Sequence, residues 1–225
     1  MRRGEADRVE EWIVASVKVP RVYLYVITRD YGFAPNPFHG FCTLATCKPL
    51  IRKNAQIGDY IIGVGMAKSL HFKHIVYYMR VCEAVTFDEY WSNERFQKKK
   101  PIVDGSLKYC YGDNIYHREN GVWIQSDSHH YGKDGATNYI NLDRDTQRNR
   151  VLISYPSNWG YFGELSFLTP SKFDKIYLNR IGQWTLSDAD GQEIIELLFT
   201  LPKGINGDPA KWGKASKMEK YNGID

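Results

Sequence analysis

The chain has 225 residues, of which 43% are hydrophobic and 25% are charged, and its net charge at pH 7 is +4. These values are typical of a globular protein with one large domain and exclude a disordered chain. No apolar run reaches the roughly 18 residues that a membrane helix needs, and the N-terminus lacks the apolar stretch of a secretion signal. We therefore expect a cytoplasmic protein with no membrane partner.

The chain begins with a stretch of near-helical apolar spacing over residues 1–20, which predicts a short helical appendage ended by Pro20. Val22–Thr28 is β-branched and aromatic throughout, as in a buried strand. Arg29–Gly40 is dense in Gly, Pro, Asn and Asp and predicts an ordered loop. Phe41–Lys53 follows, and we expect a strand and then one helical turn there.

The middle of the chain contains alternating strand and turn signals. Gln56–Val64 predicts a tight turn and a strand, and Ile75–Thr86 predicts one longer strand. Phe87–Asn93 is expected to be a short helix capped by Thr86. Asn114–His117 and Val122–Gln125 are spaced as the two strands of a hairpin.

Four further segments complete the expected elements. Tyr139–Leu142 and Val151–Tyr155 predict short strands, and Asn158–Leu165 predicts an aromatic turn broken by glycine. Asp188–Leu201 has the apolar spacing of the best helix in the chain. We divide the chain into the appendage, a single domain over 21–204, and a polar C-terminal tail over 205–225.

These elements predict an α+β protein rich in strands, with a curved, mostly antiparallel sheet and peripheral helices. Four strands should share that sheet: Val22–Thr28, Tyr60–Val64, Ile75–Thr86 and Val151–Tyr155. The helix Asp188–Leu201 should cover one opening or face of it.

The cysteines and the missing motifs limit the chemistry. Four cysteines contain no CxxC pair, so we predict no structural zinc, no disulfide and mostly buried, reduced thiols. The chain has no phosphate-binding GxxxxGK[ST] loop, no strand-linked GxGxxG, no GxSxG and no HExxH. We therefore expect neither a metal nor a cofactor.

Polar residues concentrate in three places, the loop Asp30–His39 and the segments Gly112–His117 and Ser126–Tyr131. Three of the six histidines of the chain lie in the last two segments. His117, Asp127 and His129 could act as general acid, general base or orienting group if the hairpin brings them together. The alternative is a polar surface loop, and the residues alone leave both interpretations open.

The longest motifs carry a family resemblance. The run VYLYVITRDYGFAPNPFHGFCTLATCKP, followed by IGDYIIGVG and IVYYMRVCEAVTFDEYW, resembles the second of the nucleotide-modification-associated domain families. That family occurs in phages and bacteria beside genes that modify DNA bases. The resemblance covers roughly residues 20–200 and implies a role with modified nucleotides, without implying an established reaction.

A second resemblance is to the PUA-like superfamily, which contains the EVE, YTH and ASCH domains. It rests on the strand pattern of Ile57–Val64 and Val76–Trp91. It implies a bent pseudo-barrel that holds a flipped or modified base in an aromatic pocket. Residues 104–170 depart from this pattern, since a minimal domain of that type lacks such an insertion.

Two functions are favoured at this stage over a structural protein that only bridges partners, which no residue excludes. The first is recognition of a modified base or nucleotide, with DNA as the expected partner, in a base-modification or phage-defence system. The second is an enzyme that makes or edits such a nucleotide with His117, Asp127 and His129. In either case the three polar segments should meet around one pocket. The expected ligand-binding residues are Asp30, Tyr31, Asn36, Phe38, Asp113, Asn114, Tyr116, Ser128, His130 and Trp159.

Overall fold

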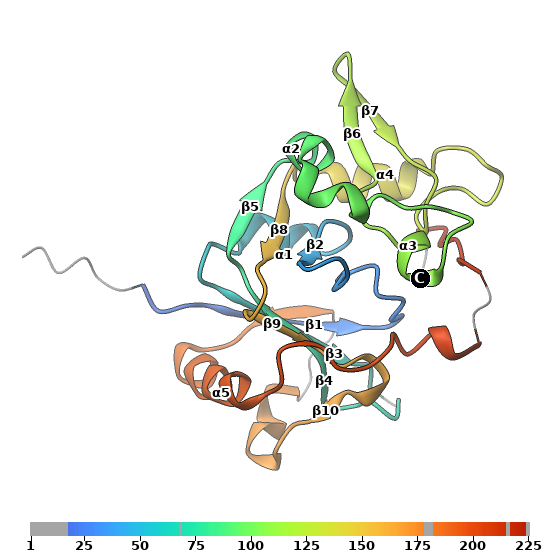
Figure 1. Ribbon diagram of the computed structural model, residues 1–225. Helices are drawn as coiled ribbons and strands as arrows, with labels where there is room; N and C mark the ends of the chain where they lie inside the picture. Colours follow the sequence, from blue (N-terminus) through green and yellow to red (C-terminus); the bar gives the residue numbers. More distant parts are fainter. Residues whose placement is uncertain (1–17, 68, 178–181, 215–216, 224–225) are drawn as a thin grey trace, which may run out of the picture.

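The computed structural model describes residues 18–67, 69–177, 182–214 and 217–223, which form a mixed α+β fold (Figure 1). The strands are β1 (Val22–Ile27), β2 (Cys42–Leu44), β3 (Tyr60–Gly65), β4 (His74–Arg80), β5 (Glu83–Val85), β6 (Tyr116–Glu119), β7 (Val122–Gln125), β8 (Val151–Ser154), β9 (Trp159–Tyr161), β10 (Phe167–Leu168), β11 (Gln183–Thr185) and β12 (Gly204–Ile205). The α-helices are α1 (Pro49–Asn54), α2 (Phe87–Ser92), α3 (Leu107–Cys110), α4 (Tyr139–Thr146) and α5 (Asp188–Thr200). Short 3-10 helices cover Glu94–Lys99, Gly163–Leu165, Ser171–Tyr177 and Trp212–Lys214.

The main sheet has the strand order β11-β1-β3-β4-β9-β12, with β10 paired to β4. It is mixed, because β1 pairs with β3 in parallel and β12 pairs with β9 in parallel, while the other neighbours are antiparallel. Successive side chains of a strand point to opposite faces, so Val22 and Leu24 pack toward α5 with Ile194 and Leu198. The helix α5 therefore covers one face of the sheet, as Figure 1 shows.

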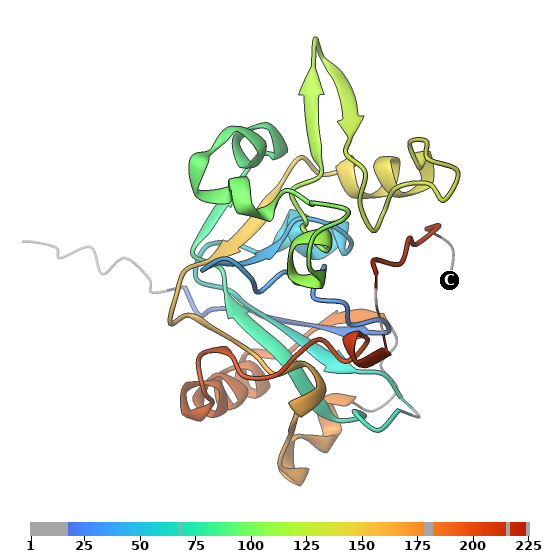
Figure 2. The ribbon, with the colours of Figure 1, turned by 45° about the vertical axis from the view of Figure 1, so that its right-hand side comes forward.

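The opposite face of the main sheet supports a second layer. Tyr23 and Tyr25 of β1 pack with Leu44 of β2, Ile51 of α1 and Leu152 of β8. These elements belong to a three-stranded sheet of order β2-β8-β5 and to α1 beside it. Beyond this layer the hairpin β6–β7 projects from the body, with α2 and α4 at its base (Figures 1 and 2).

Several expected elements are confirmed. The helix α5 begins at Asp188, and α2 begins after Thr86, which forms a capping box with Glu89. The strand and helical turn expected within 41–53 are β2 and α1. The hairpin β6–β7 is present, but its first strand is Tyr116–Glu119 rather than Asn114–His117, and its turn residues Asn120 and Gly121 both have positive φ.

Two expectations about the sheet are corrected. The segment Ile75–Thr86 is not one strand, because β4 ends at Arg80 and β5 joins the other sheet. Val151–Tyr155 is also absent from the main sheet, since β8 pairs with β2 and β5. The main sheet is not closed on itself, so the structure does not show a pseudo-barrel.

Two local assignments were also wrong. Tyr139–Leu142 is the first turn of α4 and not a strand, and the Asn138 side chain caps this helix by accepting from the Asn141 N–H. The segment 158–165 contains a strand, β9, which pairs with β4 inside the main sheet. The glycine in this strand has a packing role. Gly160 leaves room for Pro202 and Tyr78, which an added Cβ would meet at 2.5 and 2.7 Å.

The two ends of the chain differ in what the structure describes. The expected helical appendage falls mainly on residues 1–17, which lie outside the described residues. Near the other end, residues 217–223 pack against the body. The N–H of Tyr221 donates to the His129 carbonyl, and the Asn141 side chain donates to the Tyr221 carbonyl. Within the described residues, no helix is long and apolar enough to cross a membrane.

Candidate functional site

The first component of the site is a sharp turn that carries Cys47 between β2 and α1. Cys47 and Lys48 have φ values of 57° and 39°, and both lie in the left-handed region. A non-glycine residue there is strained, and such residues cluster at functional sites. Pro49 then starts α1, since its fixed φ suits the first helical position. The turn leaves Cys47 partly exposed while the preceding residues of β2 are buried.

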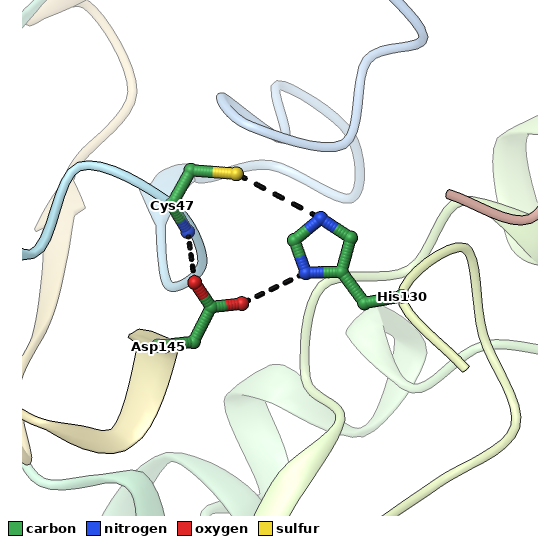
Figure 3. A group of neighbouring side chains, drawn as sticks. All are labelled: Cys47, His130 and Asp145. Carbon is green, nitrogen blue, oxygen red and sulfur yellow. Dashed lines mark hydrogen bonds and ion pairs between the residues drawn. The ribbon is translucent and has the colours of Figure 1, made fainter. Parts of the chain in front are cut away.

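Cys47 faces a histidine that an aspartate holds in place (Figure 3). The Cys47 Sγ lies 3.7 Å from His130 Nε2, and His130 Nδ1 lies 2.8 Å from Asp145 Oδ2. The other carboxylate oxygen, Oδ1, accepts a hydrogen bond of 2.9 Å from the Cys47 N–H. Asp145 therefore fixes both the imidazole and the turn that carries the thiol. A nucleophile, a base and a group that orients the base are thus aligned.

Asp145 lies in a strongly cationic environment. It is fully buried, and Arg144 Nε lies 3.3 Å from its Oδ1, while the Tyr116 hydroxyl donates to Oδ2 at 3.0 Å. Arg52 is also fully buried, and its guanidinium donates to four backbone carbonyls, including that of Asp145. Burial alone would raise the pKa of Asp145, but His130, Arg144 and Arg52 together hold it well below its usual range. The carboxylate is therefore ionised at neutral pH.

The charge on His130 follows from this carboxylate. Burial by itself would lower the pKa of His130, but the neighbouring Asp145 and Cys47 raise it to about 9. The imidazole therefore keeps its proton at neutral pH. The adjacent His129 behaves in the opposite way, because burial, His130 and Arg29 lower its pKa to about 3. Two consecutive histidines thus provide one charged ring and one neutral ring.

Cys47 and His130 line a cavity of about 340 Å³. This size is within the range of small-molecule sites. Aromatic rings form much of its wall, and three cationic side chains reach it from separate elements. The aromatic lining residues are Tyr25, Tyr31, Phe33, His129 and Tyr221, and the cationic ones are Arg29, Lys48 and Arg144. The cavity is therefore suited to a planar and anionic ligand.

The same three side chains could also be considered as metal ligands, since their donor atoms lie within 4.8 Å of one another. Asp145, however, bonds the Nδ1 of the imidazole whose Nε2 faces the thiol. In that arrangement the carboxylate supports the histidine from behind and leaves two direct ligands, Cys47 and His130. Structural zinc takes four protein ligands and catalytic zinc takes three. The geometry suits proton transfer better than metal binding.

Three of the residues expected from sequence reach the cavity. Tyr31, His129 and His130 line it, and the His129 ring lies 4.9 Å from the Tyr31 ring. Tyr116 lies behind the cavity and holds Asp145 by its hydroxyl. The loop after β1 and the segment 126–131 therefore meet at the cavity, whereas no residue of the third expected segment, Gly112–His117, belongs to the lining that the structure describes.

The other expected residues lie elsewhere. Asn36, Asp113 and Asn114 are fully buried in an interior polar network around Lys99. Asp30 is buried and accepts a hydrogen bond of 2.5 Å from the Tyr161 hydroxyl. The remaining five are Phe38, stacked on Trp212; His117, stacked on Trp91; Asp127, paired with Lys220; Ser128, buried; and Trp159, buried in β9.

Sequence reasoning missed two of the three central residues. Cys47 was assigned to the buried thiols, although it precedes Lys48-Pro49, and a proline at the first turn of a helix is a sequence signal for a helix start. All four cysteines are free thiols, and Cys47 is the one at the cavity. Asp145 lies in α4, a segment that was expected to hold a strand, so its position facing His130 could not be derived.

The comparisons with known proteins give one family. The profile of nucleotide modification associated domain 2 matches residues 19–216. No curated protein and no solved structure gives a significant match. The matched range contains β1, the Cys47 turn, His130 and Asp145, and it confirms the resemblance seen in the sequence. The chain therefore belongs to the nucleotide modification associated domain 2 family.

Proposed function

We propose that this protein is a cysteine-dependent enzyme that acts on a nucleotide or on a modified base within a nucleotide-modification system. The observation that supports the proposal is the alignment of Cys47, His130 and Asp145 at the wall of the cavity. Family membership supports the nucleotide as substrate class. The protonated His130 gives the sulfur a positive neighbour, which is the setting in which catalytic cysteines react as thiolates.

The reaction class that fits this arrangement is acyl transfer. The Cys47 sulfur attacks the carbonyl carbon of an amide or ester substituent on the nucleotide, and an S–C bond forms. The C–N or C–O bond breaks as His130 Nε2 donates its proton to the leaving group. His130 then takes a proton from water, and the resulting hydroxide attacks the thioester and releases the carboxylic acid and the Cys47 thiolate. Asp145 stabilises the imidazolium in each step.

Recognition without catalysis is the second candidate function. The aromatic wall of the cavity favours it, because Tyr31, Phe33 and Tyr221 offer ring faces on which a base could stack. This candidate does not depend on a closed pseudo-barrel of PUA-like type. It differs from the first in one testable respect, since a pure recognition module has no use for a reactive thiol.

Selective alkylation tests the thiol directly. We propose to treat the protein with limiting iodoacetamide at pH 6 and to follow each cysteine by peptide mass spectrometry. Cys82 is a matched internal control, because it is also partly exposed and its sulfur contacts the Arg80 carbonyl and Ser154 Oγ. At pH 6 an ordinary thiol, with a pKa near 8.5, is mostly unreactive. We expect Cys47 to react at least roughly tenfold faster than Cys82, and His130→Gln to remove the difference.

Turnover distinguishes the two candidate functions. Nucleotides that carry amide- or ester-linked base substituents are incubated with the wild type, Cys47→Ser and Cys82→Ser, and the products are followed by liquid chromatography with mass spectrometry. The enzyme proposal expects product from the wild type and Cys82→Ser only. Equal alkylation of Cys47 and Cys82, together with ligand binding that survives Cys47→Ser, would favour recognition instead.

A further inference from the structure

We propose that the cavity takes a nucleotide that carries a phosphate, and that Arg29, Lys48 and Arg144 bind this phosphate. The inference deepens the proposed function and rests on it, since it takes the cavity next to Cys47 as the substrate site. The three cations come from different parts of the fold: the loop after β1, the turn before α1, and α4. Their convergence on one cavity is therefore a property of the folded chain.

Positive charge predominates among the described residues that line the cavity. Among the described residues that line it, three carry a permanent positive charge and none is a carboxylate. His130 adds a fourth positive charge at neutral pH because its pKa is raised to about 9. Cationic side chains that line one cavity can bind the oxygens of an anionic ligand together.

Within the described residues, the carboxylate of Asp145 lies behind the cavity wall. Asp145 already contacts both His130 and Arg144. The fully buried Arg52 adds a further positive charge nearby, and its guanidinium donates to four backbone carbonyls. Asp145 therefore has three positively charged neighbours among the described residues, and two of them, His130 and Arg144, line the cavity.

Tyr221 brings two of the cations together. The guanidinium carbon of Arg29 lies 4.6 Å from the centre of the Tyr221 ring, and that of Arg144 lies 5.8 Å from it. A guanidinium over a ring still presents its N–H edge, which matches the oxygens of a phosphate in bidentate fashion. Figure 2 shows the C-terminal segment, in red, running up the side of the molecule toward α4, which supplies Arg144.

The apolar part of the cavity suits the base of the same ligand. Tyr31 and Phe33 lie 4.9 and 5.0 Å from the neutral ring of His129. Such rings stack on any base without selecting its sequence. A cavity of about 340 Å³ is far too small for a duplex, so a base within DNA would have to be flipped out of the helix to enter. The ligand is one nucleotide unit, either free or flipped out of a strand.

The experiment measures binding calorimetrically, with Cys47→Ala protein so that no chemistry interferes. The probes are the four deoxynucleoside 5′-monophosphates, the matching nucleosides, inorganic phosphate, and a single-stranded hexamer and a duplex dodecamer of DNA. Each probe is tested on this protein and on two added variants. Arg29→Gln removes a cation of the cavity. Arg118→Gln is the matched control, since Arg118 is also exposed and stacks on a ring, that of Trp123 in the hairpin.

We expect the monophosphates to bind roughly tenfold or more tightly than the nucleosides. Arg29→Gln should remove most of this difference, Arg118→Gln should not, and inorganic phosphate should compete. If only the DNA probes show the Arg29-dependent gain, the phosphate belongs to a strand and the flipped nucleotide is the ligand. Equal binding of nucleotides and nucleosides, with no effect of Arg29→Gln on any probe, would overturn the inference. That result leaves the alkylation of Cys47 untouched, so the two proposals can fail separately.

Discussion

His130 Nδ1 lies 2.8 Å from Asp145 Oδ2, and both side chains are almost completely buried. This contact joins the loop after β7 to the helix α4. It also sets the direction in which the imidazole faces Cys47, because a ring held through Nδ1 presents only Nε2 to its other neighbour. The Asp145–His130 contact is therefore the part of the site on which both charge and orientation depend.

Asp145→Asn should impair turnover much more than binding. The asparagine keeps the shape of the side chain but loses the charge that holds the imidazolium, and we expect turnover to fall by roughly 10²–10⁴-fold. The measurement is the rate of product formation by the wild type and the variant, with ligand affinity determined in parallel. Alkylation of Cys47 at pH 6 should slow as well.

Asp143→Asn is the matched control for this substitution, since Asp143 lies on the same helix but is exposed. It should leave turnover and alkylation unchanged. If Asp145→Asn and Asp143→Asn behaved alike, the role of Asp145 in positioning His130 would be disproved.

The stability of the protein should fall with pH because of His130. Its folded pKa of about 9 is above the ordinary 6.5, so the native state binds more protons between these two pH values. His130 therefore contributes about 3 kcal/mol to the free energy of unfolding. This contribution is fully present below pH 6.5 and is lost as the pH rises to 9. Urea unfolding of the wild type and His130→Gln at several pH values measures it. The difference in the free energy of unfolding between the wild type and His130→Gln should narrow from pH 6.5 to 9. A difference that stays constant would contradict the positive charge on His130.

Lys99 should have the opposite effect at higher pH, where it should make the free energy of unfolding rise with pH. It is fully buried, and its ammonium lies 2.8 Å from each of three oxygens, those of the Asn36 and Phe41 carbonyls and Asn36 Oδ1. Burial lowers its pKa to about 8, although Asp113 and Cys42 favour the charged form. Between pH 8 and 10.5 the unfolded chain therefore binds more protons, and stability rises with pH.

The test for Lys99 is the same unfolding measurement on Lys99→Met, between pH 8 and 10.5. We expect the free energy of unfolding of the wild type to increase by about 3 kcal/mol over this pH range relative to that of the variant. Lys98→Met is the control, because Lys98 is its exposed neighbour, and it should follow the wild type. Parallel pH profiles for the wild type and Lys99→Met would show that Lys99 keeps an ordinary pKa.

Local sequence patterns predicted the elements that depend on neighbouring residues. The helix cap at Thr86, the existence of the hairpin that ends in Val122–Gln125 and the apolar face of α5 each depend on residues close together in the chain. Long-range pairing was not predictable in the same way. β8 joins β2 rather than the main sheet, and an apolar run such as VLIS fits either place equally well.

The candidate site was predictable only in part for a similar reason. His130 was named because polar residues gather around it, but its partner Cys47 is 83 residues away in the chain. The left-handed backbone at Cys47 and Lys48 could not be predicted, because neither residue is a glycine, the usual sequence signal for this conformation. Asn36 and Asp113 looked like ligand-binding residues because they are polar and flank turns. They lie inside the protein, where the buried Lys99 donates to Asn36, and the Thr43 and Tyr90 hydroxyls donate to the Asp113 carboxylate.

Tyr221→Ala tests whether the C-terminal segment is part of the site. The ring lines the cavity and lies under Arg29 and Arg144, so its loss should both remove a stacking surface and leave the two guanidinium groups without their common support. We expect binding of deoxynucleoside monophosphates to weaken by roughly 1–3 kcal/mol. Binding of the nucleosides should weaken less, because they make no phosphate contact. Calorimetry on both ligand sets measures the two effects.

The control for Tyr221→Ala is Tyr139→Ala, which removes an exposed tyrosine at the start of α4. Tyr139 is absent from the cavity lining, so this variant should bind both ligand sets as the wild type does. The two variants should also differ in the access of reagents to Cys47, since only the loss of Tyr221 widens the cavity. A bulky maleimide should therefore label Cys47 faster in Tyr221→Ala than in Tyr139→Ala. Equal labelling rates and equal affinities in the two variants would show that the segment 217–223 packs beside the cavity without shaping it.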